Sequence, residues 1–243
     1  MKNIVISDVL KSNYENYYSG GDSTWRAISA MKKAENIIAL CERYPHRSIL
    51  EIGAGEGSLL KQLDEQSFGD ELFALEVSSS GVEVIKNKQI SRLTECLLFE
   101  GYDIPFKDQQ FDLAILSHVL EHVEFPRKLL YEASRVARYI FIEVPLEDNI
   151  RLKNDFIFDK VGHINFYSPK TFRRLIQTCN LQVLEQTITN TSKAAQIYQN
   201  GKKGLLKYYI KEYILRALPG IASKIFTYHS SIVCRPKTQF PLA

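Results

Sequence analysis

The sequence predicts an α/β protein with a Rossmann-like, doubly wound, mostly parallel sheet of seven strands and helices on both faces. Three observations predict this fold. From Arg47 onward, short apolar runs alternate with helical segments, an order typical of parallel sheets. The runs are almost continuously apolar, as expected for strands covered on both faces. The first run, at 48–52, leads into Gly53-Ala54-Gly55-Glu56-Gly57, a turn that lets the backbone approach a ligand closely.

The elements follow in a regular order along the chain. Strands are expected at 48–52, 72–77, 95–99, 111–117, 139–144, 181–188 and 230–234. Helices are expected at 24–41, 58–63, 79–88 and 126–137, and another begins at Pro169 with Ser168 as its N-cap. Residues 190–226 are basic and predicted to be helical, so they form an insertion before the last strand.

The chain divides into three parts by pattern and charge. Residues 1–46 form an N-terminal helical extension, 47–189 the α/β core, and 190–243 the basic helical segment with the last strand. The net charge of +3 is unevenly distributed, because residues 190–243 carry +8 and residues 1–189 carry −5.

Composition excludes some protein classes. We find no apolar stretch long enough for a membrane span, and the N-terminus does not fit a secretory signal. The cysteines lack metal-type spacing, so we expect reduced thiols, no metal and a cytoplasmic location. These are Cys41, Cys96, Cys179 and Cys234.

The glycine turn and an acid downstream indicate a nucleotide-type ligand. Glu76 ends the second strand, twenty-one residues after Gly55, where a carboxylate accepts hydrogen bonds from ribose hydroxyls. Both a dinucleotide and S-adenosylmethionine fit such a site. The dinucleotide fingerprint places its third glycine one residue later than Gly57, where this chain has Ser58. A strand-end acid exposed to solvent is the structural alternative for Glu76.

Further motifs follow in a fixed order. They are an acid and an Ile-Pro-Phe turn within 100–106, a Phe-Asp strand start and a Leu-Glu-His-Val helix start within 111–123, and His163-Ile164-Asn165-Phe166-Tyr167-Ser168-Pro169. With these motifs the chain resembles the class I S-adenosylmethionine-dependent methyltransferases. Within that class it is similar to the small-molecule branch that includes the ubiquinone and menaquinone C-methyltransferases. The resemblance covers about 45–190 and the last strand.

The resemblance implies roles for particular residues around S-adenosylmethionine. The glycine turn would contact the methionine part and the ribose, Glu76 the ribose, and Val77 the adenine. Glu100 and Gly101, or Asp103 instead, would lie at the adenine edge. Ser117 and His118 would lie beside the sulfonium. The full implied set is Glu51, Gly53, Ala54, Gly55, Gly57, Glu76, Val77, Glu100, Gly101, Asp103, Ser117 and His118.

Three histidines are candidate general bases, since a base is needed when the methyl acceptor is a hydroxyl. His163 lies in the loop after the fifth strand, where it serves either as a base or as a loop anchor. His118 fits a role beside the cofactor better than base catalysis. For His122, helix capping or packing is the favoured interpretation.

Two flanking segments carry alternatives. Tyr14, Tyr17, Tyr18, Trp25 and Arg26 either cover the cofactor or pack as an amphipathic helix. The segment 202–216 combines a lysine stripe at 203, 207 and 211 with apolar residues. It fits a substrate lid, a peripheral membrane contact, a homodimer contact, or a packed helix with solvated lysines.

The sequence therefore predicts a methyltransferase that uses S-adenosylmethionine and acts on a small-molecule or lipid- or sugar-linked acceptor, with oxygen as the preferred atom. The alternative is a catalytically silent subunit that binds the same cofactor. The early third glycine argues against an oxidoreductase. The mildly acidic core and the lack of an Asn/Asp-Pro-Pro-Tyr/Phe motif argue against a nucleic-acid substrate.

Overall fold

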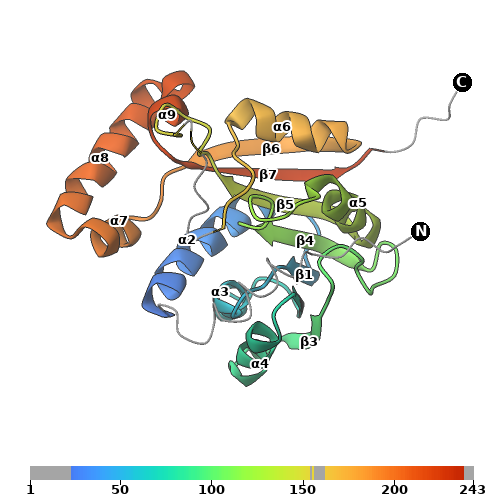
Figure 1. The fold of residues 1–243 in the computed structure, drawn as a ribbon. Helices are drawn as coiled ribbons and strands as arrows, with labels where there is room; N and C mark the ends of the chain where they lie inside the picture. The colour runs from blue at the N-terminus through green and yellow to red at the C-terminus, as the bar shows by residue number, and fades with distance from the viewer. Residues whose placement is uncertain (1–22, 154, 156–161, 238–243) are drawn as a thin grey trace, which may run out of the picture.

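The computed structural model describes residues 23–153, 155 and 162–237 (Figure 1). Seven strands form one sheet: β1 Ser48–Ile52, β2 Glu71–Glu76, β3 Leu93–Leu98, β4 Phe111–Ser117, β5 Ala137–Pro145, β6 Leu181–Thr189 and β7 His229–Pro236. The helices are α2 Ser23–Cys41, α3 Ser58–Glu65, α4 Ser79–Asn87, α5 Pro126–Val136, α6 Pro169–Thr178, α7 Lys193–Asn200, α8 Lys202–Ala217 and α9 Pro219–Ile225.

The strand order is β3-β2-β1-β4-β5-β7-β6, and every neighbouring pair is parallel except those that involve β7. The chain runs outward from β1 to β3 and then returns to place β4 on the other side of β1. The strand order therefore reverses between β1 and β4, where open α/β sheets bind their ligands. The predicted fold class is confirmed.

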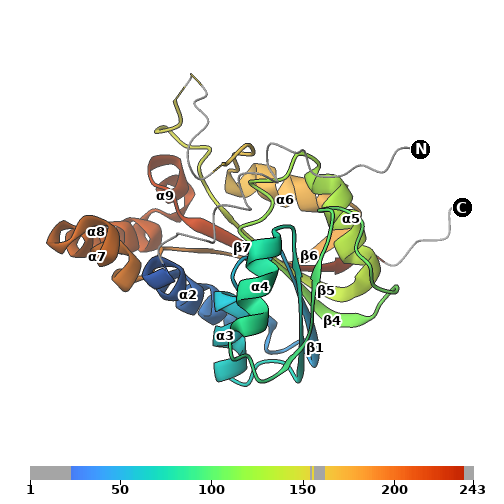
Figure 2. The ribbon, with the colours of Figure 1, turned by 60° about the horizontal axis from the view of Figure 1, so that its bottom comes forward.

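The two faces of the sheet are covered by different helices (Figures 1 and 2). Alternate residues of each strand point to opposite faces. On β1, Leu50 and Ile52 pack in the cluster that holds α5 and α6, whereas Ile49 packs in the cluster that holds α2, α3 and α4. Strands that are apolar on both faces follow directly from this double covering.

The buried strand β5 carries an acid among its apolar residues. Glu143 of β5 is fully buried and lies on the α2 face of the sheet. Its Oε2 accepts a 2.7 Å hydrogen bond from Asn36 Nδ2 of α2 and a 2.6 Å bond from Ser231 Oγ of β7. A buried carboxylate needs such partners because desolvation is costly.

The local signals at α6 are confirmed, since Ser168 caps this helix in a capping box with Thr171 and Pro169 is its first residue. The expected helix start at Leu-Glu-His-Val is wrong. Residues 120–122 form a turn, and α5 begins only at Pro126, because proline suits the first helical position. Among the described residues, no helix has the length and apolar character to cross a membrane.

Candidate active site

A cavity of about 880 Å³ lies over the carboxyl ends of the parallel strands. Its floor comes from the glycine turn after β1 and from the ends of β2, β4 and β5. Residues of α2, α7 and α8 line its other side. The reversal of strand order and the helical insertion thus enclose one space.

The glycine turn needs a backbone that other residues rarely adopt. Gly53, Gly55 and Gly57 all have positive φ. A Cβ on Gly53 would lie 2.8 Å from Val119 Cγ2, so only glycine fits there. Gly53, Ala54 and Gly55 line the cavity, and Gly57 is the N-cap of α3.

Glu76 ties the glycine turn to the neighbouring strand. Its Oε2 accepts a 2.7 Å hydrogen bond from the Gly55 backbone N–H, and its Oε1 accepts one of 3.1 Å from the Ser78 N–H. The carboxylate is buried but lines the cavity, and Val77 lies beside it. The acid expected to bind ribose therefore also holds the turn in place.

Glu51 is buried beneath the same turn and lines the cavity. Among the described residues, its Oε2 has no hydrogen-bond partner. Burial raises its pKa to about 8, although Lys33 acts in the opposite direction. An unpaired buried carboxylate at the cavity wall fits the ammonium group of S-adenosylmethionine.

The residues expected at the adenine edge do not all line the cavity. Gly101 lines the cavity together with Phe99 and Tyr102. Glu100 and Asp103 are exposed and lie outside the lining set, and Asp103 pairs with Lys128 at 2.8 Å.

Four histidines and three glutamates form a continuous array along one wall. His118 follows β4, and its Nδ1 lies 3.0 Å from Glu121 Oε1 while its Nε2 lies 3.4 Å from Glu143 Oε1. The ring of His229, the first residue of β7, packs edge-on against His118 at 4.6 Å. The remaining members, His122, His163 and Glu147, continue the array along the rim.

The residues of this array differ in the direction in which their surroundings shift their pKa values. Burial and Lys33 oppose a charged His118, but Glu121 and Glu143 outweigh them and raise its pKa. Burial likewise opposes ionisation of the two carboxyls, but pairing with His118 lowers their pKa values. Burial lowers the pKa of His229 to about 3, so this ring is neutral near pH 7.

The rim of the array contains a second histidine–carboxylate pair. His163 Nδ1 lies 2.6 Å from Glu147 Oε2, and both side chains line the cavity. The ring of His122 packs edge-on against His163 at 4.7 Å, and its Nδ1 lies 3.2 Å from the Gly162 carbonyl oxygen. Burial lowers the pKa of His122.

The helical parts complete the enclosure. Trp25 and Arg26 of α2 line the cavity, and the Trp25 ring stacks on Tyr198 of α7 at 6.2 Å. The expected cover residues Tyr14, Tyr17 and Tyr18 lie outside the described residues.

The lysine stripe of α8 turns toward the cavity. Lys207 and Lys211 line it, whereas Lys203 is exposed. Lys211 is only 3% exposed and donates a 2.7 Å hydrogen bond to the Thr227 carbonyl oxygen.

Several of these residues were not predicted from the sequence. An acid at position 143 within an apolar strand was a signal of a buried polar role. Glu121 is part of the Leu-Glu-His-Val motif, and Glu147 follows the end of β5 by two residues. His229 gave no signal, because only β7's position in the sheet brings it to His118.

The sequence pattern of a methyltransferase domain family matches residues 28–186. The chain therefore belongs to this family. Its cofactor is S-adenosylmethionine, and the fold is that of the methyltransferases that use it. Glu51 and the glycine turn are the described features that fit this cofactor.

One curated protein is similar to part of the chain. An uncharacterized protein of Methanocaldococcus jannaschii is 28% identical over 125 residues, 51% of this chain and 56% of that protein. The chain thus matches about half the length of that relative.

Solved structures are similar over most of this chain. The [4+2]-cyclase SpnF has a TM-score of 0.63 at 13% identity, over 93% of this chain and 86% of SpnF. A putative sarcosine dimethylglycine methyltransferase of Galdieria sulphuraria has a TM-score of 0.60 at 15% identity, over 93% of this chain and 94% of that protein. A Haemonchus contortus phosphoethanolamine N-methyltransferase was solved with phosphomonomethylethanolamine and S-adenosylhomocysteine. It has a TM-score of 0.62 at 14% identity, over 96% of this chain and 61% of that protein.

Glu76→Ala is expected to weaken S-adenosylhomocysteine binding by at least about tenfold, because hydrogen bonds to a charged group are lost. Calorimetric titration measures the affinity, and circular dichroism checks the fold. Glu71→Ala, an exposed acid at the other end of β2, is the control and should bind normally. Normal affinity in a folded Glu76→Ala protein would contradict the assigned role.

Cofactor affinity is expected to rise between about pH 6 and pH 8 and then level off, because the ammonium group binds ionised Glu51, whose pKa is about 8. Below that pKa the free protein carries a proton that binding must release. Titrations in buffers of different ionisation enthalpy detect this proton. Glu51→Gln should abolish the release, and an unchanged release would assign it to another group.

Proposed function

We propose that this protein transfers the methyl group of S-adenosylmethionine to a hydroxyl oxygen of a small-molecule or lipid-linked acceptor, with His163 as the general base. The observation that carries this proposal is the 2.6 Å contact between His163 Nδ1 and Glu147 Oε2 at the cavity wall. A carboxylate in this position orients the imidazole and stabilises its charged form once it takes a proton.

His163 suits this role better than the other histidines. His118 lies between two carboxylates that favour its charged form, so it is a poor proton acceptor. Burial disfavours the charged form of His122. His163 has a carboxylate partner that would compensate the charge it acquires.

The chemistry requires mainly alignment. When bound, S-adenosylmethionine supplies an activated methyl group on a sulfonium. The glycine turn, Glu51 and Glu76 would hold it at the β1 and β4 ends, and the walls formed by α2, α7 and α8 would exclude water. His163 would accept the hydroxyl proton while the new carbon–oxygen bond forms and the carbon–sulfur bond breaks. Fixed alignment supplies much of the acceleration in such a displacement.

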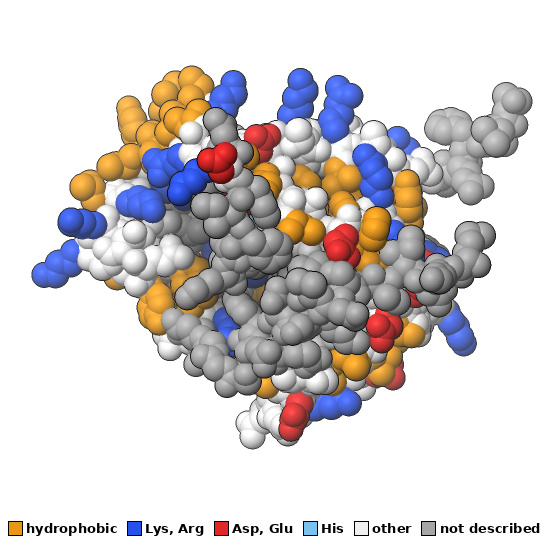
Figure 3. Space-filling model, viewed as in Figure 1, with side chains coloured by type: hydrophobic (Ala, Val, Ile, Leu, Met, Phe, Trp, Pro, Cys, Tyr) orange, Lys and Arg blue, Asp and Glu red, His pale blue; other side chains and the backbone are white. Residues whose placement is uncertain are grey.

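The outer side of the helical insertion supports a lipid-linked acceptor. Two lysines of α8 face the cavity, and the opposite side of this helix exposes apolar and aromatic residues. Leu206 is 66% exposed and Tyr213 is 72% exposed. Hydrophobic side chains gather over α8 and α9 with lysines and arginines around them (Figure 3). Apolar side chains surrounded by basic ones suit an anionic membrane surface.

His163→Gln is expected to lower kcat by about 10²- to 10⁴-fold, because the base is lost, and to leave cofactor affinity unchanged. S-adenosylhomocysteine formation is measured with hydroxylated small molecules and lipid-linked sugars as acceptors. A ¹³C-labelled methyl group then identifies the methylated atom by NMR. His46→Gln, outside the cavity, is the matched control.

Three results would contradict this proposal. Transfer to nitrogen or carbon would contradict a hydroxyl acceptor. Full activity in His163→Gln would assign the proton to another group. Cofactor binding without acceptor-dependent turnover across the screen would favour the catalytically silent subunit.

Binding to anionic vesicles is expected to fall several-fold in Tyr213→Glu, because a charge is placed on the apolar face of α8. Vesicle co-sedimentation measures it, with neutral vesicles for comparison. Tyr131→Glu on α5, a tyrosine of 50% exposure, should bind like the wild type. Vesicle binding that is equal in both variants would contradict a membrane contact. A dimer that Tyr213→Glu disrupts would instead identify the face as a contact between copies of the chain.

A further inference from the structure

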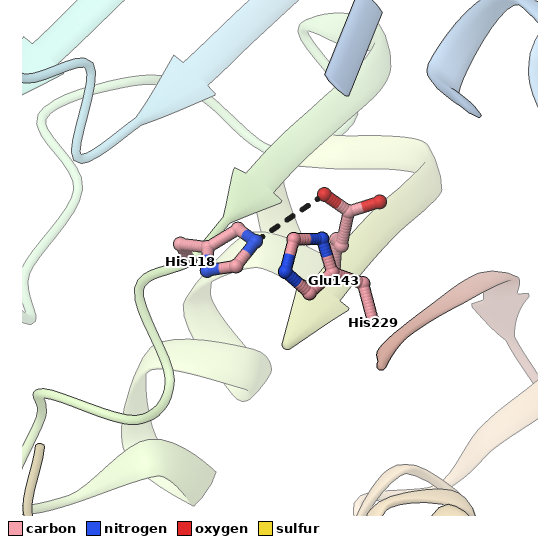
Figure 4. Close-up of side chains that lie close together, drawn as sticks. All are labelled: His118, Glu143 and His229. Atoms are coloured by element: carbon pink, nitrogen blue, oxygen red, sulfur yellow. Dashed lines mark ion pairs between the residues drawn. The ribbon is translucent and has the colours of Figure 1, made fainter. Parts of the chain in front are cut away.

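We propose that His118, Glu143 and His229 form a binding site for one divalent transition-metal cation of the zinc class. The three side chains come from the end of β4, from β5 and from the start of β7, and they converge at one point (Figure 4). One potential ligand atom from each lies within 4.8 Å of the others. Two imidazoles and one carboxylate form a common ligand set for such cations.

The spacing of two ligand atoms already suits a metal. His118 Nε2 and Glu143 Oε1 are 3.4 Å apart. Two ligands of a tetrahedral zinc ion are separated by about 3.3 Å when each bond is about 2.0–2.1 Å long. His229 offers the third potential ligand atom, within 4.8 Å of those of His118 and Glu143.

The backbone and neighbouring groups fix both ligands. His118 has a φ of +60°, and its N–H donates a 2.9 Å hydrogen bond to the Glu143 carbonyl oxygen. Its Nδ1 faces Glu121, which leaves Nε2 for a metal. Glu143 Oε2 already accepts from Asn36 and Ser231, so Oε1 is the oxygen left for a metal.

The two facing atoms lack other partners. Among the described residues, neither His118 Nε2 nor Glu143 Oε1 has a hydrogen-bond partner. Glu143 is fully buried, and an unpaired buried carboxylate oxygen is costly. A cation between the two atoms would satisfy both at once.

The local charge also favours a cation. Glu121 and Glu143 both face His118, at 3.0 and 3.4 Å from its ring nitrogens. A cation that took the place of the His118 proton would keep a positive charge beside both carboxylates.

The adjacent group of Glu121, His122 and His163 is a weaker candidate. Its ligand atoms also lie within 4.8 Å of one another. However, His122 already contacts the Gly162 carbonyl oxygen, and His163 already pairs with Glu147. His229 and His118 also line the cavity, so a metal bound by them would keep an open position toward it. A contact between that position and the acceptor rests on the proposed function, whereas metal binding itself does not.

Metal titration of the full chain tests the site without any acceptor. Protein freed of metal with a chelator is titrated with Co²⁺, whose visible absorption reports the ligand geometry, and with Zn²⁺ by calorimetry. We expect one bound ion per chain. His229→Ala and Glu143→Gln should each weaken binding by at least about tenfold. His46→Ala, a histidine outside the cavity, should bind as the wild type does.

His229→Ala separates metal binding from folding better than Glu143→Gln does, because Glu143 accepts hydrogen bonds from Asn36 and Ser231 that support the fold. Circular dichroism and S-adenosylhomocysteine titration verify that each variant is folded, and His229→Asn replaces any variant that is not. Absence of binding to the wild type would overturn the site, because a proton then satisfies His118. Wild-type metal affinity in folded His229→Ala and Glu143→Gln proteins would also overturn it. So would a loss of binding in His122→Ala, a variant of the weaker candidate group, when the other two variants still bind.

Discussion

The candidate site depends on the reversal of strand order between β1 and β4. This reversal leaves the ends of β1, β2, β4 and β5 open on the same edge of the sheet, so their terminal side chains share one space. The glycine turn can approach a ligand there because Gly53 has no Cβ to contact Val119. Glu76 then couples the turn to β2 through the Gly55 N–H. Other elements add further lining residues around this fixed edge.

Buried charge is the second constraint. Buried carboxylates lie at the wall of the cavity and behind it, where an unpaired charge is costly in a low-dielectric interior. Glu143 is satisfied on one oxygen by Asn36 and Ser231, which join α2 and β7 to β5. Its other oxygen faces His118 Nε2 at 3.4 Å. The same interactions that position the histidines therefore also hold the helix and the antiparallel strand against the core.

The helical insertion has an unusual orientation. A helix on a globular protein normally turns its apolar side inward. α8 packs Ile214 and Leu215 against the core, but it also presents Lys207 and Lys211 to the cavity and leaves Tyr213 exposed. Lys211 is held inside by the Thr227 carbonyl oxygen and by the ring of Tyr228, 4.7 Å away. The result is a basic cavity wall and an apolar outer face on one element. Both features suit an acceptor with a polar part in the cavity and an apolar part outside it.

The sequence by itself determined the fold class, the glycine turn, Glu76 at the end of its strand and the start of α6 at Ser168, because these depend on local periodicity and on turn and capping chemistry. It also singled out His118 and His163 as residues in loops after strands. Only the tertiary structure decided that His229 meets His118, since β7 runs antiparallel and therefore begins where β4 and β5 end. It alone decided which side of α8 faces inward. Spacing shows that lysines share a side of a helix, but the neighbouring elements determine where that side points.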